Sequence, residues 1–157
     1  MLPLLESYFD RLQRLHRDAE EALDGLPPEA LDWSPAPEVN SLVVLTTHLA
    51  GSERYWMGDV AGQDPSGRVR EEEFRTQGVD AAALKQRLAA VLAHSRGVLE
   101  KLTLEDLDAR RVSPMDGREV SVGWAIAHAL EHTAVHVGHM QVTRQWWEWQ
   151  RMASHSG

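Results

Sequence analysis

Residues 126–141 read IAHALEHTAVHVGHMQ and place four histidines within one segment of helical pattern. His128, His132, His136 and His139 follow one another at steps of four, four and three positions. Because each residue of an α-helix turns about 100° around the axis, the four side chains fall within an arc of about 80°. So many imidazoles on one face indicate a polar helix face inside the fold or a metal site.

Two histidines one turn apart can bind one metal ion together, because their rings lie about 5–6 Å apart on the helix surface. Spacing alone does not choose among the four, and a hydrogen-bonded or solvated pair is the alternative interpretation. A metal site needs a third ligand from elsewhere, and His48 is the candidate, since it lies mid-segment between Leu45 and Leu49. Thr133 follows His132 where a zinc-peptidase helix carries glutamate, so that class of enzyme is excluded.

Apolar residues recur at steps of three and four in four segments, as they do in amphipathic helices. This pattern predicts helices over about residues 2–23, 42–61 and 80–102, and a last helix from Ser121 past Trp149. Asn40 or Ser41 can cap the second helix.

The connections between these helices differ in character. Prolines interrupt residues 25–37, and residues 110–120 predict a turn or a small hairpin. Residues 63–78, with three glutamates at 71–73, predict a solvated loop with one short helical turn. We therefore predict an all-α fold with a single domain over residues 1–157, a four-helix bundle. An antiparallel bundle is the simplest arrangement, and the long loops are also compatible with a crossover.

The amino-acid composition argues against several classes of partner and of chemistry for this protein. A formal net charge of -8 argues against nucleic acid as a partner, because phosphate binding needs clustered Lys and Arg. No apolar run approaches the roughly 20 residues that span a bilayer, and the first residues lack a signal-peptide pattern, so we expect a cytoplasmic protein without membrane contact. With no cysteine, the chain offers neither a disulfide nor a thiolate.

Two motifs resemble the DinB/YfiT-like superfamily of four-helix bundles, which includes mycothiol-dependent maleylpyruvate isomerase. They are Asn40-Ser41 followed by His48–Trp56, and the later segment Glu131–Gln141. The resemblance covers nearly the whole chain. It implies that His48, His132 and His136 hold a divalent transition metal such as zinc, nickel or iron. The resemblance thus makes the choice among histidines that spacing leaves open.

The resemblance also suggests residues near the metal. His128 and His139 are candidates for contacts with the ligands or the substrate, with ordinary packing as the alternative. Tyr55 and Arg144 are further candidates for substrate contacts.

The function that the resemblance implies is that of a metal-dependent transferase or isomerase using a low-molecular-weight thiol with a small-molecule substrate. Such a thiol would be mycothiol, bacillithiol or glutathione. One alternative is a metal-dependent hydrolase, although the sequence shows no obvious general base. The other is a bundle without enzymatic activity that binds metal or serves a stress response.

The remaining histidines and the tryptophans carry weaker expectations. His16, His94 and His155 have no visible partner and are predicted at the surface. Trp146, Trp147 and Trp149 crowd the end of the last helix and form either an oligomer surface or a local core beside the first helix. Because relatives in the superfamily are often dimers, we expect a homodimer.

Overall fold

Four long helices, four short helical segments and one hairpin make up this computed structural model, which describes residues 1–155 apart from the side chain of His155. The segments are α1 (Pro3–Leu23), α2 (Pro28–Leu31), α3 (Leu42–Arg54), η1 (Tyr55–Gly62), α4 (Arg70–Glu73), α5 (Ala81–Leu99), α6 (Leu104–Asp108), β1 (Arg110–Val112), β2 (Glu119–Ser121) and α7 (Val122–His155). The surface expectation for His155 concerns a side chain outside the described part. No helix of the described residues is long and apolar enough to cross a membrane.

The starts of the four long helices lie within one residue of the predicted positions, whereas α5 ends at Leu99, three residues before the predicted end, and the second predicted helix is divided into α3 and η1. Two of the starts carry a local signal. Ser41 caps α3 by accepting a hydrogen bond from the backbone of Val44 at 3.3 Å. Asp80 caps α5 by accepting one from the backbone of Ala83 at 2.8 Å. Such caps satisfy backbone donors that the first helical turn leaves unpaired. The short helices α2 and α6 were not expected, since a single turn is too short to show a periodic pattern.

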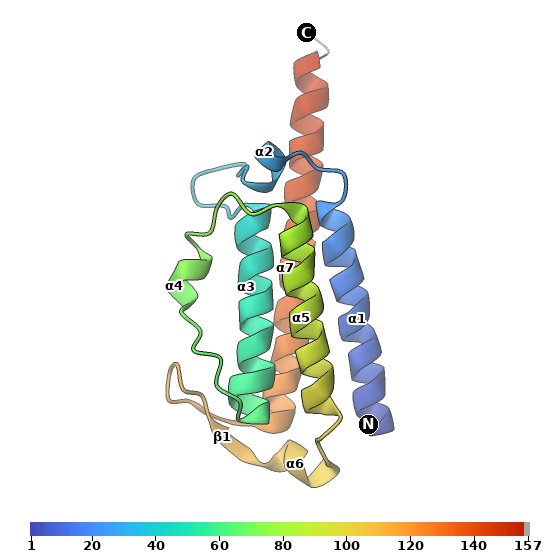
Figure 1. The fold of residues 1–157 in the computed structure, drawn as a ribbon, viewed down its shortest axis with the longest axis vertical. Helices are drawn as coiled ribbons and strands as arrows, with labels where there is room; N and C mark the ends of the chain where they lie inside the picture. The colour runs from blue at the N-terminus through green and yellow to red at the C-terminus, as the bar shows by residue number, and fades with distance from the viewer. Residues whose placement is uncertain (156–157) are drawn as a thin grey trace.

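The four helices form a bundle with a crossover connection (Figure 1). In the view of Figure 1, α1 and α7 run upward, whereas α3 and α5 both run downward. Segment 63–80, which contains α4, therefore returns along the outside of α3 before α5 begins. Of the two arrangements compatible with the sequence, the structure has the crossover and not the simple antiparallel bundle.

The helix that begins with α3 does not stay α-helical. Its last eight residues, Tyr55–Gly62, form the π-helix η1, which ends where Gln63 adopts a left-handed conformation at φ 53°. The wider π-helical turn changes the angular position of each later side chain. Beyond α5, β1 and β2 pair antiparallel with Arg111 opposite Val120, which confirms the small hairpin expected there.

A buried polar group separates two apolar clusters of the core. One cluster contains Phe9, Trp56 and Val98, and the other contains Ala19, Leu49 and Leu88.

Between these clusters along the helices lies the buried carboxylate of Glu53. It is bonded to His16 Nε2 at 2.6 Å and accepts a hydrogen bond from Ser95 Oγ at 2.6 Å. The prediction that His16 lies at the surface is wrong, since His16 is only 1% exposed. The polar partner of His16 is Glu53 of α3, and the spacing of residues along the sequence does not show a contact between two helices.

Candidate metal centre

Three imidazoles converge between α3 and α7. His48 comes from α3, and His132 and His136 are one turn apart on α7. One ligand nitrogen from each lies within 4.8 Å of the other two. Within residues 1–155, these three side chains are the group placed to hold a metal ion together. The helical arc of α7 thus brings two of its histidines against the one histidine that projects from α3.

The spacing of the His48 and His132 nitrogens fits a transition metal. His48 Nε2 lies 3.2 Å from His132 Nε2. Two nitrogens bound at about 2.0–2.1 Å to a tetrahedral ion are about 3.3 Å apart. A metal ion can therefore lie between these two rings without displacing either helix.

Burial holds His132 and His136 in the neutral form that binds metal. Burial lowers the pKa of His132 to about 3, assisted by the positive charges that His136 and His48 would carry. Burial and the neighbouring His48 and His139 lower the pKa of His136 to about 4. A neutral imidazole has one nitrogen with a free lone pair, and such nitrogens suit a divalent cation. The buried Nδ1 atoms of His132 and His136 have no hydrogen-bond partner among the described residues, so no protein group holds either ring through that nitrogen.

The third histidine has a partner that the sequence did not predict. His48 Nδ1 lies 2.8 Å from Glu73 Oε2, and Arg68 binds the same carboxylate at 2.6 Å and 2.8 Å. Burial alone would raise the pKa of Glu73, but the hydrogen bonds from Arg68 and His48 outweigh it and hold this pKa below its usual range. The expectation of a solvated loop is correct for Glu71 and Glu72 but wrong for Glu73, which is 7% exposed. No local signal distinguishes these three glutamates.

The other two histidines of the arc lie on either side of the centre. The ring of His128 stacks on Trp124 at 4.8 Å and meets the edge of Trp56 at 4.8 Å. His139 is exposed, lies 5.3 Å from the ring of His136, and lines a cavity of about 290 Å³. Both are near the centre, but neither belongs to the converging group.

Tyr55 and Arg144 use their polar atoms within the fold. The buried Tyr55 hydroxyl lies 2.7 Å from Ser113 Oγ and accepts a hydrogen bond from the backbone of Met115 at 3.0 Å. Arg144 donates to the backbone oxygens of Glu21 and Asp24 at the end of α1, at 2.7 Å and 2.8 Å. The structure thus places Tyr55 against the hairpin and Arg144 against α1.

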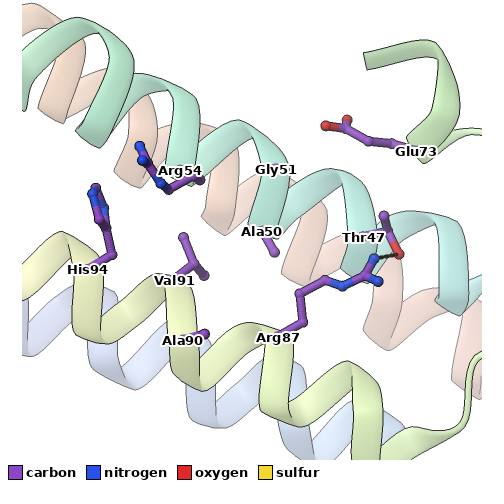
Figure 2. Close-up of a pocket in the computed structure, with 9 residues that line it drawn as sticks. All are labelled: Thr47, Ala50, Gly51, Arg54, Glu73, Arg87, Ala90, Val91 and His94. Carbon is purple, nitrogen blue, oxygen red and sulfur yellow. Dashed lines mark hydrogen bonds between the residues drawn. The ribbon is translucent and has the colours of Figure 1, made fainter. Parts of the chain in front are cut away.

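A separate hollow of about 390 Å³ lies between α3 and α5 (Figure 2). Arg87 donates to Thr47 Oγ1 at 2.9 Å across it, and the carboxylate of Glu73 reaches toward Gly51 at its rim. His94, at another edge, is 24% exposed and bonded to Asp64 at 3.0 Å, so it is not the free surface residue expected. None of the three converging histidines lines this hollow.

Fold and centre together define a helical bundle with a three-histidine site. The model of the DinB superfamily matches residues 11–140, so the chain belongs to this superfamily. No curated protein matches the chain in sequence. Membership confirms the fold class expected from the two motifs.

Solved structures with this fold are distant in sequence. A conserved protein from Enterococcus faecalis has a TM-score of 0.78 at 17% identity, over 92% of this chain and 97% of that one. YfiT from Bacillus subtilis, described as "a probable metal-dependent hydrolase with an unusual four-helix bundle topology", has a TM-score of 0.74 at 13% identity, over 95% and 90%. A variant of mycothiol-dependent maleylpyruvate isomerase has a TM-score of 0.66 at 14% identity, over 87% and 60%. At such identities the likeness shows a shared fold.

Proposed function

We propose that the protein is a metal-dependent enzyme in which His48, His132 and His136 hold one divalent transition metal ion, such as zinc, nickel or iron. The observation that supports it is the convergence of three imidazoles, whose nitrogens lie within 4.8 Å of one another. Three protein ligands leave room for a further molecule, as in catalytic sites. When bound, the ion would lower the pKa of a thiol or of water and stabilise the resulting anion.

We further propose that a low-molecular-weight thiol is the nucleophile. A thiol has an ordinary pKa of about 8.5, so a nearby cation is enough to deprotonate it, whereas water requires more assistance. Glu73, the carboxylate that touches the centre, is already bound by Arg68 and lies on the Nδ1 side of His48. It is therefore badly placed to take a proton from water beside His132. Because the chain has no cysteine, the thiol must come from a second molecule.

Side chains beside the centre suggest how an electrophilic substrate would bind. The stacked rings of Trp124 and His128 form an aromatic wall, and the guanidinium of Arg118 lies 4.4 Å from the Trp124 ring. This combination suits a small molecule with a flat or apolar part and a negative charge. We propose His128 and His139, whose rings flank the centre, as the substrate contacts, since Tyr55 and Arg144 are engaged elsewhere.

The first experiment is elemental analysis of protein purified without a metal-affinity column. We expect about one metal ion per chain, and loss of this ion in His48→Ala and His136→Ala. His94→Ala is the matched control, since His94 lies outside the converging group and should leave the metal content unchanged. Equal metal content in His48→Ala and wild-type protein would refute the site.

The second experiment separates the possible reactions. Metal-loaded protein is incubated with an aryl halide electrophile and, separately, with mycothiol, bacillithiol or glutathione. We expect conjugation with one thiol, in which sulfur bonds to the aryl carbon and halide and the thiol proton leave. No conjugation with any of the three would reject the thiol proposal.

Hydrolysis is a second candidate function, supported by the likeness to YfiT. Turnover of esters or amides without thiol, lost in His48→Ala, would favour it. Inertness in both assays, together with metal-dependent changes in assembly, would favour a bundle that binds metal without catalysis.

We also propose a homodimer formed through α7, which extends beyond the other helices (Figure 1). Val135, Val142, Trp146 and Trp149 are 50–68% exposed. Their spacing places them within about 60° on one helix face. Trp147 instead packs against Trp33 at 5.6 Å and belongs to a local contact. Sedimentation should show a dimer that Trp146→Ser/Trp149→Ser converts to a monomer, and a monomeric wild-type protein would reject this assembly.

A further inference from the structure

The segment between η1 and α5 carries charged side chains that are buried, although its composition is typical of a solvated loop. Within it, the side chains of Arg68 and Glu73 are each only 8% exposed. Arg68 binds both oxygens of the Glu73 carboxylate, at 2.6 Å and 2.8 Å. Burying an ion pair costs free energy of desolvation unless hydrogen bonds satisfy all its polar atoms. The burial of this pair against α3 therefore calls for a structural explanation.

The explanation is that the Arg68–Glu73 pair is hydrogen-bonded to a third group, the imidazole of His48; we call these three side chains the network. Glu73 Oε2 lies 2.8 Å from His48 Nδ1, whereas Arg68 Nη2 is farther from that nitrogen, at 3.5 Å. A carboxylate only accepts hydrogen bonds, so His48 Nδ1 must carry the proton and donate. In a neutral ring the lone pair is then on Nε2, the nitrogen that faces His132 at 3.2 Å.

Glu73 reaches His48 because the next turn of α3 leaves space for it. Gly51 lies three residues after His48, and a Cβ added there would lie 2.8 Å from Glu73 Cδ and closer still to Oε1. Figure 2 shows the Glu73 side chain extending from α4 toward Gly51. The ring of the neighbouring Phe74 packs beside the His48 ring in a tilted arrangement, with the two ring centres 4.8 Å apart. Two adjacent residues of the crossover segment thus restrain the ring, Glu73 through a hydrogen bond and Phe74 through packing.

The outer support of the network comes from η1. The guanidinium of Arg68 lies 5.6 Å from the centre of the Tyr55 ring, and Tyr55 is bonded to Ser113 next to the hairpin. Arg68 is therefore held by an aromatic face on one side and by the Glu73 carboxylate on the other. The network leads from the hairpin through Arg68 and Glu73 to the ring of His48.

We propose that Glu73, fixed by Arg68, is a positioning residue that sets the tautomer and orientation of His48 for metal binding. This inference rests on the proposed metal site. A carboxylate bonded to the distal nitrogen of a ligating histidine fixes the ring and makes it a stronger ligand. The crossover segment is then part of the site and not only a connection.

The test compares Glu73→Gln, Glu73→Ala and Glu72→Gln. Glu72 is the matched control, because it precedes Glu73 in α4 and is exposed. Zinc affinity is measured by competition with a chromophoric chelator. Loss of such a supporting group lowers metal affinity by about 10–100-fold, so we expect this loss in Glu73→Ala, a smaller one in Glu73→Gln, and none in Glu72→Gln. Zinc affinity within twofold of wild type in a folded Glu73→Ala protein would overturn the proposal.

Gly51→Ala provides a second variant that keeps the carboxylate but blocks its place. The added methyl should push Glu73 away from His48 and reduce zinc affinity in the same direction as Glu73→Ala. Unchanged affinity in folded Gly51→Ala protein would contradict the role of this contact.

A third measurement depends neither on a variant nor on metal. The ¹⁵N shifts of the His48 ring in metal-free wild-type protein should report a proton on Nδ1, and a proton on Nε2 instead would overturn the positioning role. Failure of the metal site itself has a different signature. The wild-type protein would then bind no zinc, while its His48 would still show the Nδ1 tautomer.

Discussion

The buried carboxylate of Glu53 offers the sharpest test of how the bundle is stabilised. Its side chain is 0% exposed and receives two short contacts, from His16 Nε2 and Ser95 Oγ, both at 2.6 Å. In Glu53→Ala both partners lose their acceptor while remaining buried. Each stranded polar group costs about 1–3 kcal/mol, so the free energy of unfolding should fall by about 2–6 kcal/mol. For a domain of this size, Tm should fall by roughly 5–20 °C.

The assay is urea unfolding of metal-free protein, followed by circular dichroism. Glu21→Ala is the control, because Glu21 is exposed on α1 and its loss should be nearly neutral. The triple variant His16→Leu/Glu53→Leu/Ser95→Ala replaces the whole polar group by apolar side chains and should regain most of the lost stability. A Glu53→Ala protein within 1 kcal/mol of wild type, or a triple variant no more stable than Glu53→Ala, would refute this reasoning.

Three further predictions concern the pH dependence of stability, the helix cap of α5 and a glycine in close contact with a neighbouring side chain. His132 and His136 have pKa values of about 3 and about 4 in the fold, below their ordinary value, so the unfolded chain binds more protons as pH falls from about 6.5 to 4. The free energy of unfolding of the metal-free protein should therefore fall as pH falls across that window. In His132→Asn/His136→Asn, urea titrations at several pH values should show a weaker dependence of this free energy on pH, and an unchanged dependence would contradict the prediction. Asp80→Ala should cost about 1 kcal/mol through loss of the α5 cap, whereas no change in the urea midpoint would reject the cap. Gly58→Ala should displace Arg54, since an added Cβ would lie 2.7 Å from Arg54 Cζ, and should lower stability by about 1–3 kcal/mol; a neutral effect on Tm would show that Arg54 can move freely.

The three-histidine cluster shows how far local reasoning reaches. His132 and His136 share a face of α7 because the helical repeat is a local property, and the position of His48 between apolar neighbours marks it as inward-facing. The family resemblance was needed to choose this trio from five candidate histidines. The structure brings the trio within 4.8 Å.

The contacts that restrain the three histidines join residues that lie far apart in the sequence. Glu73 lies 25 positions from His48 in the chain, and its selection over Glu71 and Glu72 depends on the path of the crossover segment. Likewise, His16 and Glu53 are 37 positions apart and meet only once α1 and α3 are packed. The spacing of residues along the sequence does not show which distant residues come into contact in the folded protein.

By itself, then, the sequence determined the four long helices, the cap at the start of α3 and the arc of histidines on the last helix. Each follows from backbone geometry and side-chain chemistry over a few residues. The tertiary structure decided the crossover topology, the burial of His16 and the partner of His48. These depend on which surfaces remain exposed to water after packing, because a charged side chain is placed inside only where distant parts of the chain supply its hydrogen bonds.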